Sequence, residues 1–294
     1  MGYVNVHARS ELTSAGVRRN SISFEEPSGM KEIYWQFSGE YLPFAPADMD
    51  FALIALLPYV MNKGLNIRVE GTLTRSLIEG VEECMDVWVR WRPDLFRKIQ
   101  VDGDALAEDF LPQNRDAIMM FSGGVDSTFT LVAHKARLLG NRSLDLKAGV
   151  MVHGFDVPLD KPEWFRNAVI HAKAILSEHD VGLTLVETNW RELSVDWEMG
   201  FGFGLFAILH QFHGKSSYGV LSTDEPYGEE HFPWGNNSIT NPLLSGLSFP
   251  VRSCGGGQSR TERVAAIASS PAVRSHIRVC WERPDLDPNC GECE

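Results

Sequence analysis

The sequence predicts an α/β protein, with a parallel sheet covered by helices on both faces and a smaller α+β domain at the N-terminus. From about residue 116 onward, short apolar runs alternate with amphipathic segments of helical period, which is the pattern of consecutive βαβ units. Before that point, strand-like segments alternate between polar and apolar residues, as in sheets with one wet face. Hydrophobic residues make up 44% of the 294 residues, which is ample for a core.

Residues 1–114 are expected to form the smaller α+β domain. Alternation over residues 33–37 and 65–70 predicts two strands. A helix is expected between them from Asp48 to Lys63, closed by Gly64 at its C-terminal cap. A second helix ends before Pro93 and has a single apolar stripe, formed by Leu77, Val81, Cys84, Met85 and Trp88. Nothing in this domain suggests catalysis.

Residues 115–294 are expected to form the larger domain, built on a parallel sheet. Four apolar runs predict its strands, at residues 118–121, 148–153, 183–186 and 218–221. Helices are expected after the first strand to about Leu139, from Pro162 onward, and over residues 204–212. Ligands of such sheets bind beyond the carboxyl ends of the strands. Polar residues collect at those ends: Ser122, Asp126, Asp156, Thr188, Asn189, Ser222 and Asp224.

The segment at residues 118–128 is the most informative part of the chain. A buried strand ending at Phe121 turns through Ser122, Gly123 and Gly124 directly into a helix. Glycines let the backbone approach a ligand, and the first N–H groups of a helix have no internal partner, so they bind anions. The segment therefore predicts a phosphate or pyrophosphate site. The plain alternative is a strand–turn–helix with Asp126 as its N-cap and no ligand.

The hexapeptide Ser-Gly-Gly-Val-Asp-Ser at residues 122–127 resembles the pyrophosphate loop of the ATP pyrophosphatase (PP-loop) family. It matches neither a Walker A loop nor a dinucleotide fingerprint. The resemblance implies a Rossmann-like, adenine nucleotide alpha hydrolase-like domain that cleaves ATP between its α and β phosphates. Residues 241–245, the glycines at 255–257, a capping box at 259–262 and the run 289–293 are similar to relatives of 7-cyano-7-deazaguanine synthase. The similarity spans about residues 115–294.

The resemblance implies which residues would hold ATP. Ser122, Asp126 and Ser127 are expected to take part in catalysis, with Asp126 also holding Mg²⁺ directly or through water. Arg260 or Arg263 is expected to supply positive charge where pyrophosphate leaves. The segment at residues 152–155 is expected near the adenine. The full nucleotide-binding set is Phe121, Ser122, Gly123, Gly124, Val125, Asp126, Ser127, Thr128, Val152, His153, Gly154 and Phe155.

The C-terminal cysteines have the spacing of part of a zinc site. Cys290-x-x-Cys293, with Cys280 ten positions earlier, matches the ligand pattern of structural zinc. The resemblance implies a fourth cysteine a few residues after Cys293, and the sequence given ends at Glu294. Either that cysteine follows in a longer chain, or the fourth ligand is Cys254, a histidine or water. The alternatives are three thiols without metal, and sulfur handling through a persulfide or an iron–sulfur cluster.

The expected function is ATP-dependent adenylation of a small-molecule carboxylate or amide oxygen, with release of pyrophosphate. Ammonia or another nucleophile would then displace AMP. The net charge of −12 disfavours a nucleic-acid surface, which needs clustered Lys and Arg. Two alternatives stay open: ATP-dependent thiolation of a nucleobase or tRNA through the C-terminal cysteines, and a non-catalytic ATP-binding subunit.

The expected partners are a small-molecule substrate and an ammonia or sulfur donor, with no membrane and no nucleic acid. No apolar run reaches transmembrane length, and no secretory signal precedes the first strand. Five cysteines without such a signal indicate the reducing cytoplasm. The oligomeric state, including a homodimer, is left open.

Overall fold

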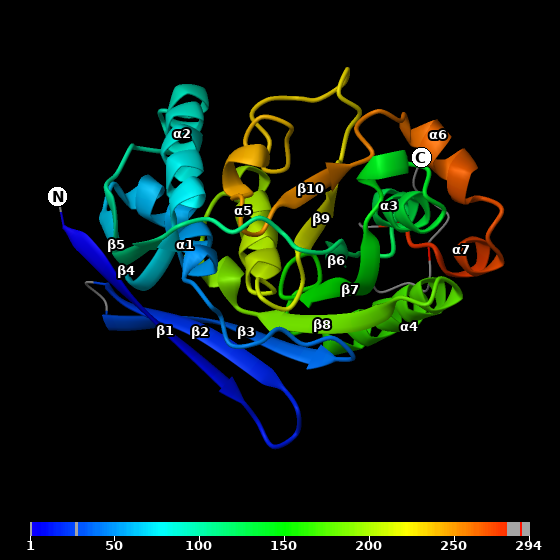
Figure 1. Cartoon of the computed structure of the whole chain (residues 1–294), viewed down its shortest axis with the longest axis horizontal. Helices are drawn as coiled ribbons and strands as arrows, with labels where there is room; N and C mark the ends of the chain where they lie inside the picture. Colours follow the sequence, from blue (N-terminus) through cyan, green and yellow to red (C-terminus); the bar gives the residue numbers. More distant parts are fainter. Residues whose placement is uncertain (1, 27–28, 281–288, 290–294) are drawn as a thin grey trace.

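The computed structural model describes residues 2–26, 29–280 and 289. Within these residues the chain is an α/β protein with one mixed, mostly parallel ten-stranded sheet and seven α-helices (Figure 1). The strand order is β10-β9-β6-β7-β8-β3-β2-β1-β4-β5. The pairs β8–β3, β3–β2 and β2–β1 are antiparallel, and the other neighbouring strands are parallel. No helix in this part of the chain is long and apolar enough to cross a membrane.

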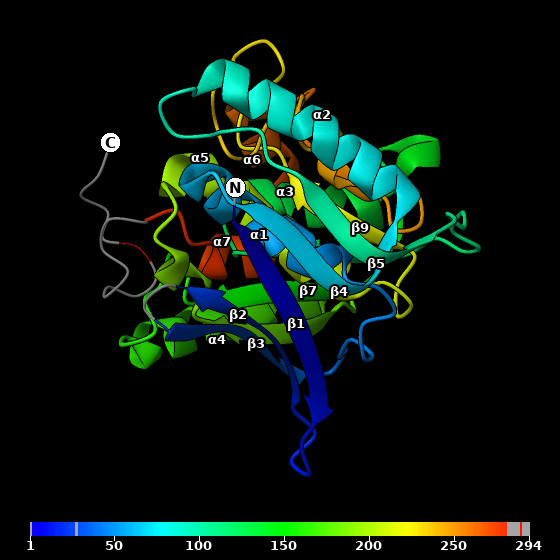
Figure 2. The ribbon, with the colours of Figure 1, turned by 90° about the vertical axis from the view of Figure 1, so that its left-hand side faces the viewer.

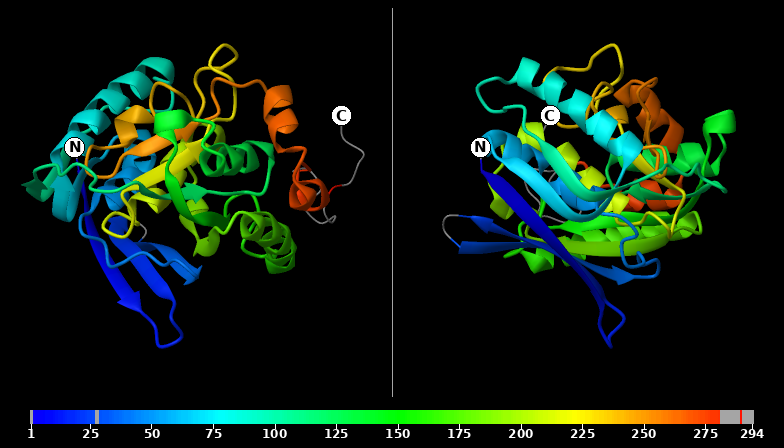
Figure 3. Two further views of the ribbon diagram at one scale, coloured as in Figure 1. Left: turned by 45° about the vertical axis from the view of Figure 1, so that its right-hand side comes forward. Right: turned by 60° about the vertical axis from the view of Figure 1, so that its left-hand side comes forward.

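The N-terminal part contributes half of the strands. The strand expected at 33–37 belongs to the longer β3, in which alternate residues are buried, and the strand expected at 65–70 belongs to β4. The sequence did not predict β1, β2 or β5, because polar residues lie on both faces of β1 and β5 is largely exposed. The β1–β2 hairpin projects from the body of the molecule (Figure 3). The bounds are β1 (Tyr3–Leu12), β2 (Arg18–Glu26), β3 (Gly29–Gly39), β4 (Asn66–Thr74) and β5 (Val101–Ala107).

The two N-terminal helices confirm the patterns that predicted them. Helix α1 (Asp50–Lys63) is apolar on all sides and buried from Asp50 to Met61, and Gly64 closes it in the left-handed conformation. Helix α2 (Arg75–Trp91) is strongly amphipathic, and its buried residues are those of the expected stripe. In Figure 2, α2 lies along the top of this part, with β1 in front. An all-apolar α1 fits its place between the sheet and other helices.

The larger part alternates strands and helices as expected, and all four predicted strands are present. Helix α3 ends at Lys135 rather than near Leu139, because Arg137 adopts a left-handed conformation that helices cannot continue through. Strand β10 was not expected. The bounds are β6 (Asp116–Met120), α3 (Val125–Lys135), β7 (Asp145–His153), α4 (Pro162–Glu178), β8 (Gly182–Thr188), α5 (Trp197–His210), β9 (Tyr218–Ser222), β10 (Val251–Cys254), α6 (Arg260–Ile267) and α7 (Pro271–His276), with short 3₁₀ turns at Gly140–Arg142, Trp190–Leu193 and Pro242–Leu244.

Helices cover both faces of the β6–β9 region of the sheet, and each face has its own core. Helices α1 and α5 lie on one face, and α3 and α4 lie on the other, with α6 beside α3 and α7 beside α4 (Figure 1). The side chains of β6 alternate between the two cores: Ile118 and Met120 join the first, while Ala117 and Met119 join the second. A strand buried on both faces must be apolar throughout, which explains the run at 118–121.

The N-terminal part and the larger part share one sheet and one core. Strand β3 pairs antiparallel with β8, with Trp35 opposite Thr188. Helix α1 packs against α5, and the Trp190 indole N–H donates a hydrogen bond of 2.9 Å to the Ala55 carbonyl on α1. The division into separate domains at residue 114 stays a prediction, but β3 and α1 cover surfaces of the larger part that are otherwise exposed.

We expect residues 115–294 expressed alone to be unable to fold cooperatively. Removing residues 1–114 leaves β8 as an unpaired edge and uncovers the apolar α5. Urea unfolding of this fragment, followed by tryptophan fluorescence and circular dichroism, should show no cooperative transition where the full chain shows one. A cooperative transition of the fragment would establish the two-domain division instead.

The buried His210 should make stability depend on pH. Burial lowers its pKa from 6.5 to about 4, and its ring Nε2–H donates to the Leu244 carbonyl at 2.9 Å. The unfolded chain therefore binds a proton that the folded chain rejects between these values. Between pH 6.5 and about 4, His210 therefore lowers the free energy of unfolding by about 1.4 kcal/mol for each pH unit of acidification. The urea-unfolding free energy of wild type relative to His210→Gln should decline from pH 7 to pH 4, and a constant difference would contradict this.

Candidate functional site

The turn between β6 and α3 has the geometry of an anion cradle. Gly123 has a φ of +79°, a conformation that favours glycine, and Gly124 is the extended N-cap of α3. The N–H groups of Val125, Asp126 and Ser127 occupy the first helical turn and make no hydrogen bond within the described chain. Three backbone donors and the positive end of the helix dipole therefore meet at this turn.

Two hydroxyl groups lie within the same turn. The Ser122 and Ser127 oxygens are 3.3 Å apart, and Ser122 Oγ accepts a hydrogen bond from the Gly124 N–H at 3.3 Å. Ser122 is exposed, whereas Ser127 is buried. The Arg278 N–H donates to the Gly123 carbonyl at 3.1 Å, so the C-terminal segment lies beside the turn. The expected loop residues thus come together, with hydroxyls as well as amides available to an anion.

The turn lies where the order of strands reverses. From β6 the chain proceeds outward through β7 and β8, and then returns to the other side of β6 to form β9 and β10. In α/β sheets the loops that leave two such strands diverge in opposite directions, and a ligand is expected in the region between them, here called the crevice. This is the position at which parallel α/β sheets bind their ligands.

Two arginines from the start of α6 contact Asp126. Arg263 Nη1 lies 2.7 Å from one carboxylate oxygen, and Arg260 Nη1 lies 3.3 Å from the other. Their environments differ, because the Arg263 side chain is 1% exposed and that of Arg260 is 63% exposed. The sequence expectation that both arginines lie near the loop agrees with this placement, but only Arg260 is free to turn toward a ligand.

The Arg263 guanidinium is fully occupied by protein acceptors. Besides Asp126, it donates to the backbone carbonyls of Thr223, Asp224, Gly255 and Gln258 and to the Thr223 hydroxyl, at 2.8 to 3.3 Å. These groups end β9 and follow β10. Arg263 therefore ties the start of α3 to the ends of two strands, which is a positioning task.

Asp224 faces the same crevice from the end of β9. Its carboxylate accepts hydrogen bonds of 2.8 Å from the Trp234 indole and from the Asn236 amide. Desolvation by the surrounding chain raises the pKa of the Asp224 carboxyl to about 6. The two hydrogen bonds lower this pKa, whereas the negative charge of Asp126 raises it further. Two carboxylates thus lie near one another at the switch point, and oxygen ligands of this kind suit Mg²⁺.

The segment expected to hold adenine, residues 152–155, is engaged in packing. His153 stacks on Phe165 with ring centroids 4.7 Å apart, and its Nε2 lies 2.9 Å from the Pro158 carbonyl. Phe155 is buried and packs against Trp190. Gly154 has a φ of +105°, and a β-carbon there would come within 1.9 Å of the Thr188 carbonyl. Among these residues the half-buried Val152 and the backbone remain for contact with a ligand.

Of the cysteines expected to bind zinc, the structure describes Cys280 and Cys254. Cys280 and Cys254 are buried in different parts of the structure, while Cys290 and Cys293 lie outside the described residues. Within residues 2–26, 29–280 and 289, no group of three or more His, Cys, Asp and Glu side chains is arranged to hold a metal ion. Cys84 belongs to the core, as its place on the apolar stripe predicted. Zinc stays a prediction.

The sequence missed the groups that organise the crevice from outside the loop. Asn236 donates to the Ser222 carbonyl as well as to Asp224, both at the end of β9. The Trp234–Asn237 run was visible as a loop of polar and aromatic residues, but nothing in it indicated contact with Asp224. At the end of β8, Thr188 is buried and the Asn189 side chain accepts a hydrogen bond from the Tyr34 N–H. These two residues therefore stabilise the sheet.

Comparison of the chain with protein-family models, with curated proteins and with solved structures found no match. The site is therefore interpreted from its geometry and from the resemblance of its loop.

Replacing Arg263 by Met should destabilise the fold by about 3–5 kcal/mol, because Asp126 and several carbonyls lose their donor. The same change at Arg260 should cost at most about 1 kcal/mol, since that ion pair is exposed. Denaturant unfolding of both variants measures the two effects. Equal stabilities would show that the buried guanidinium does not hold the crevice together.

Proposed function

We propose that the protein is an ATP-dependent ligase-type enzyme that adenylates a small-molecule carboxylate or amide oxygen and releases pyrophosphate. Ammonia or another nucleophile then displaces AMP. The proposed fold is Rossmann-like, of the adenine nucleotide alpha hydrolase-like kind, and the proposed cofactors are ATP and Mg²⁺. The proposed location is the cytoplasm.

The observation that carries this proposal is the free N-terminal turn of α3 at the switch point. The unpartnered N–H groups of Val125, Asp126 and Ser127 suit the β and γ phosphates, which become the leaving pyrophosphate. Negative charge grows on that group as the α–β bond breaks, so donors already in place stabilise the transition state more than the ground state. The match of residues 122–127 to the pyrophosphate loop supports this reading.

The chain's own residues take distinct roles in the proposed reaction. The Ser122 and Ser127 hydroxyls add hydrogen bonds to the phosphates. The Arg260 side chain is exposed, and its contact of 3.3 Å with Asp126 is readily broken. It therefore turns from Asp126 toward the departing pyrophosphate. Arg263 stays in place and positions Asp126.

Asp126 and Asp224 would hold Mg²⁺, directly or through water. When bound, the ion neutralises charge on the phosphate oxygens. The donor set fits this ion, because both groups are carboxylates at one crevice and each retains access to solvent.

The proposal is tested by following the phosphorus of Mg-ATP by NMR in the presence of ammonium and a metabolite extract. AMP with pyrophosphate is the expected result. Asp126→Asn keeps an oxygen that accepts from Arg263 but loses the charge, so it should fold and form AMP at least about 100-fold more slowly. Chelation of Mg²⁺ should stop the reaction.

Asp86→Asn is the matched control, because Asp86 is an exposed carboxylate paired with Lys98 on α2. It should react at the wild-type rate. ADP with phosphate as products would overturn the proposed class. ATP that binds without cleavage under every substrate would support the non-catalytic subunit, and loss of sulfur transfer in Cys290→Ser or Cys293→Ser would support thiolation.

A further inference from the structure

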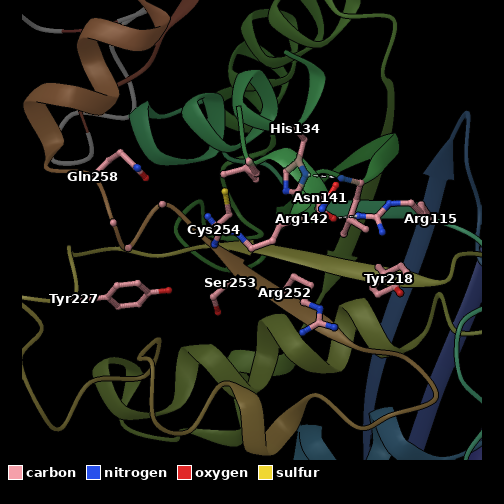
Figure 4. A pocket seen from close by; sticks show the side chains of 15 residues that line it. Arg115, His134, Asn141, Arg142, Tyr218, Tyr227, Arg252, Ser253, Cys254 and Gln258 are labelled. Carbon is pink, nitrogen blue, oxygen red and sulfur yellow. Dashed lines mark hydrogen bonds between the residues drawn. The ribbon is translucent and has the colours of Figure 1, made fainter. Parts of the chain in front are cut away.

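A cavity of about 350 Å³ lies beside β10, apart from the loop at residues 122–127 (Figure 4). It is enclosed by the end of α3, by residues 139–144 that follow this helix, and by residues 252–258 along and after β10. None of the residues 121–128 lines it. Arg263 contacts the Gly255 carbonyl at its edge, so this arginine and its partners stand between the cavity and Asp126.

The lining of the cavity is positively charged in a chain of net charge −12. Arg115, Arg142 and Arg252 line it, and no Asp or Glu does. Arg115 is engaged by backbone, because it donates to the carbonyls of Asn141 and Ser143 at 2.6 to 3.1 Å. The side chains of Arg142 and Arg252 are exposed and form no ion pair or hydrogen bond with the described chain, although the Arg252 guanidinium lies 5.9 Å from the centre of the Tyr218 ring. Two guanidinium groups are therefore available to an anion.

A buried histidine donor points to a ligand independently of the arginines. His134 lines the cavity, is 2% exposed, and accepts a hydrogen bond from the Leu144 N–H at 2.9 Å through Nδ1. Nε2 therefore carries the ring proton, and it has no acceptor within the described chain. Burial, and then the charge of nearby arginines, lower the pKa of His134 to about 4, so the ring is neutral near pH 7. A buried donor without a partner is costly, and an anion in the cavity would satisfy it.

We propose that this cavity binds the phosphate group of a small phosphate monoester. Arg142, Arg252 and the His134 Nε2–H are its principal donors. A phosphate monoester offers three terminal oxygens and about two negative charges, which matches two guanidinium groups and a neutral donor better than a single carboxylate does. The volume falls within the range of small-ligand sites. The site is separate from the proposed ATP site and does not depend on it.

The His134 ring lines this cavity, so its Nε2–H resonance is the readout. Because His134 also lines a pocket beside Lys135 and Arg137, the variant at Arg142 and Arg252 assigns the response to this cavity. Inorganic phosphate, followed by glycerol 2-phosphate, is titrated at constant ionic strength into protein labelled with ¹⁵N at histidine. The Nε2–H resonance of His134, identified by its absence in His134→Gln, should shift saturably. In Arg142→Gln/Arg252→Gln the apparent dissociation constant should rise at least about 10-fold, since charged hydrogen bonds are lost.

The control double variant is Arg9→Gln/Arg166→Gln, which removes the same charge from exposed positions on β1 and α4. It should bind phosphate as wild type does. A resonance that phosphate does not move, or that moves equally in the cavity variant, overturns the proposal. Acetate binding as tightly as phosphate would overturn the assigned ligand class. Melting temperatures verify that every variant is folded.

Discussion

The buried ion pair of Arg263 with Asp126 is the interaction on which the arrangement of the crevice depends. A guanidinium that is 1% exposed is stable only if its donors are satisfied, and here they reach a carboxylate on α3, the end of β9 and the backbone after β10. These groups belong to three separate segments of the chain. Because one rigid planar group holds them all, the loop, the β9 end and α6 keep a fixed relation to one another.

The N-terminal half serves the site indirectly, by completing the sheet. Strand β3 covers the open side of β8, and α1 fills the face that α5 leaves uncovered. The aromatic residues Trp35, Phe155 and Trp190 belong to this common core. Burial of Phe155 and Trp190 anchors the segments that follow β7 and β8.

Helix α3 presents hydrogen-bond donors without protein partners at both of its ends. Its first turn presents free N–H groups at the loop, while His134 in its last turn presents a buried ring donor to the cationic cavity. The chain is acidic overall, yet Arg115, Arg142 and Arg252 line a cavity that no Asp or Glu lines. Such local concentration of positive charge favours small anions rather than a long nucleic-acid surface.

Local patterns in the sequence determined much of this protein. Apolar runs buried on both faces identified four of the parallel strands, the stripe on α2 identified its buried side, and residues 122–127 identified the turn that leaves Val125 to Ser127 unpartnered. Each of these depends on neighbours within a few positions. Only the tertiary structure decided that β3 joins β8, that Arg263 rather than Arg260 is buried, and that Arg115, Arg142 and Arg252 line one cavity with His134. The partners in these contacts lie far apart in the sequence, as Trp35 and Thr188 do. Whether a charged side chain meets a partner or solvent depends on which strands and helices pack together, and no local pattern in the sequence encodes that.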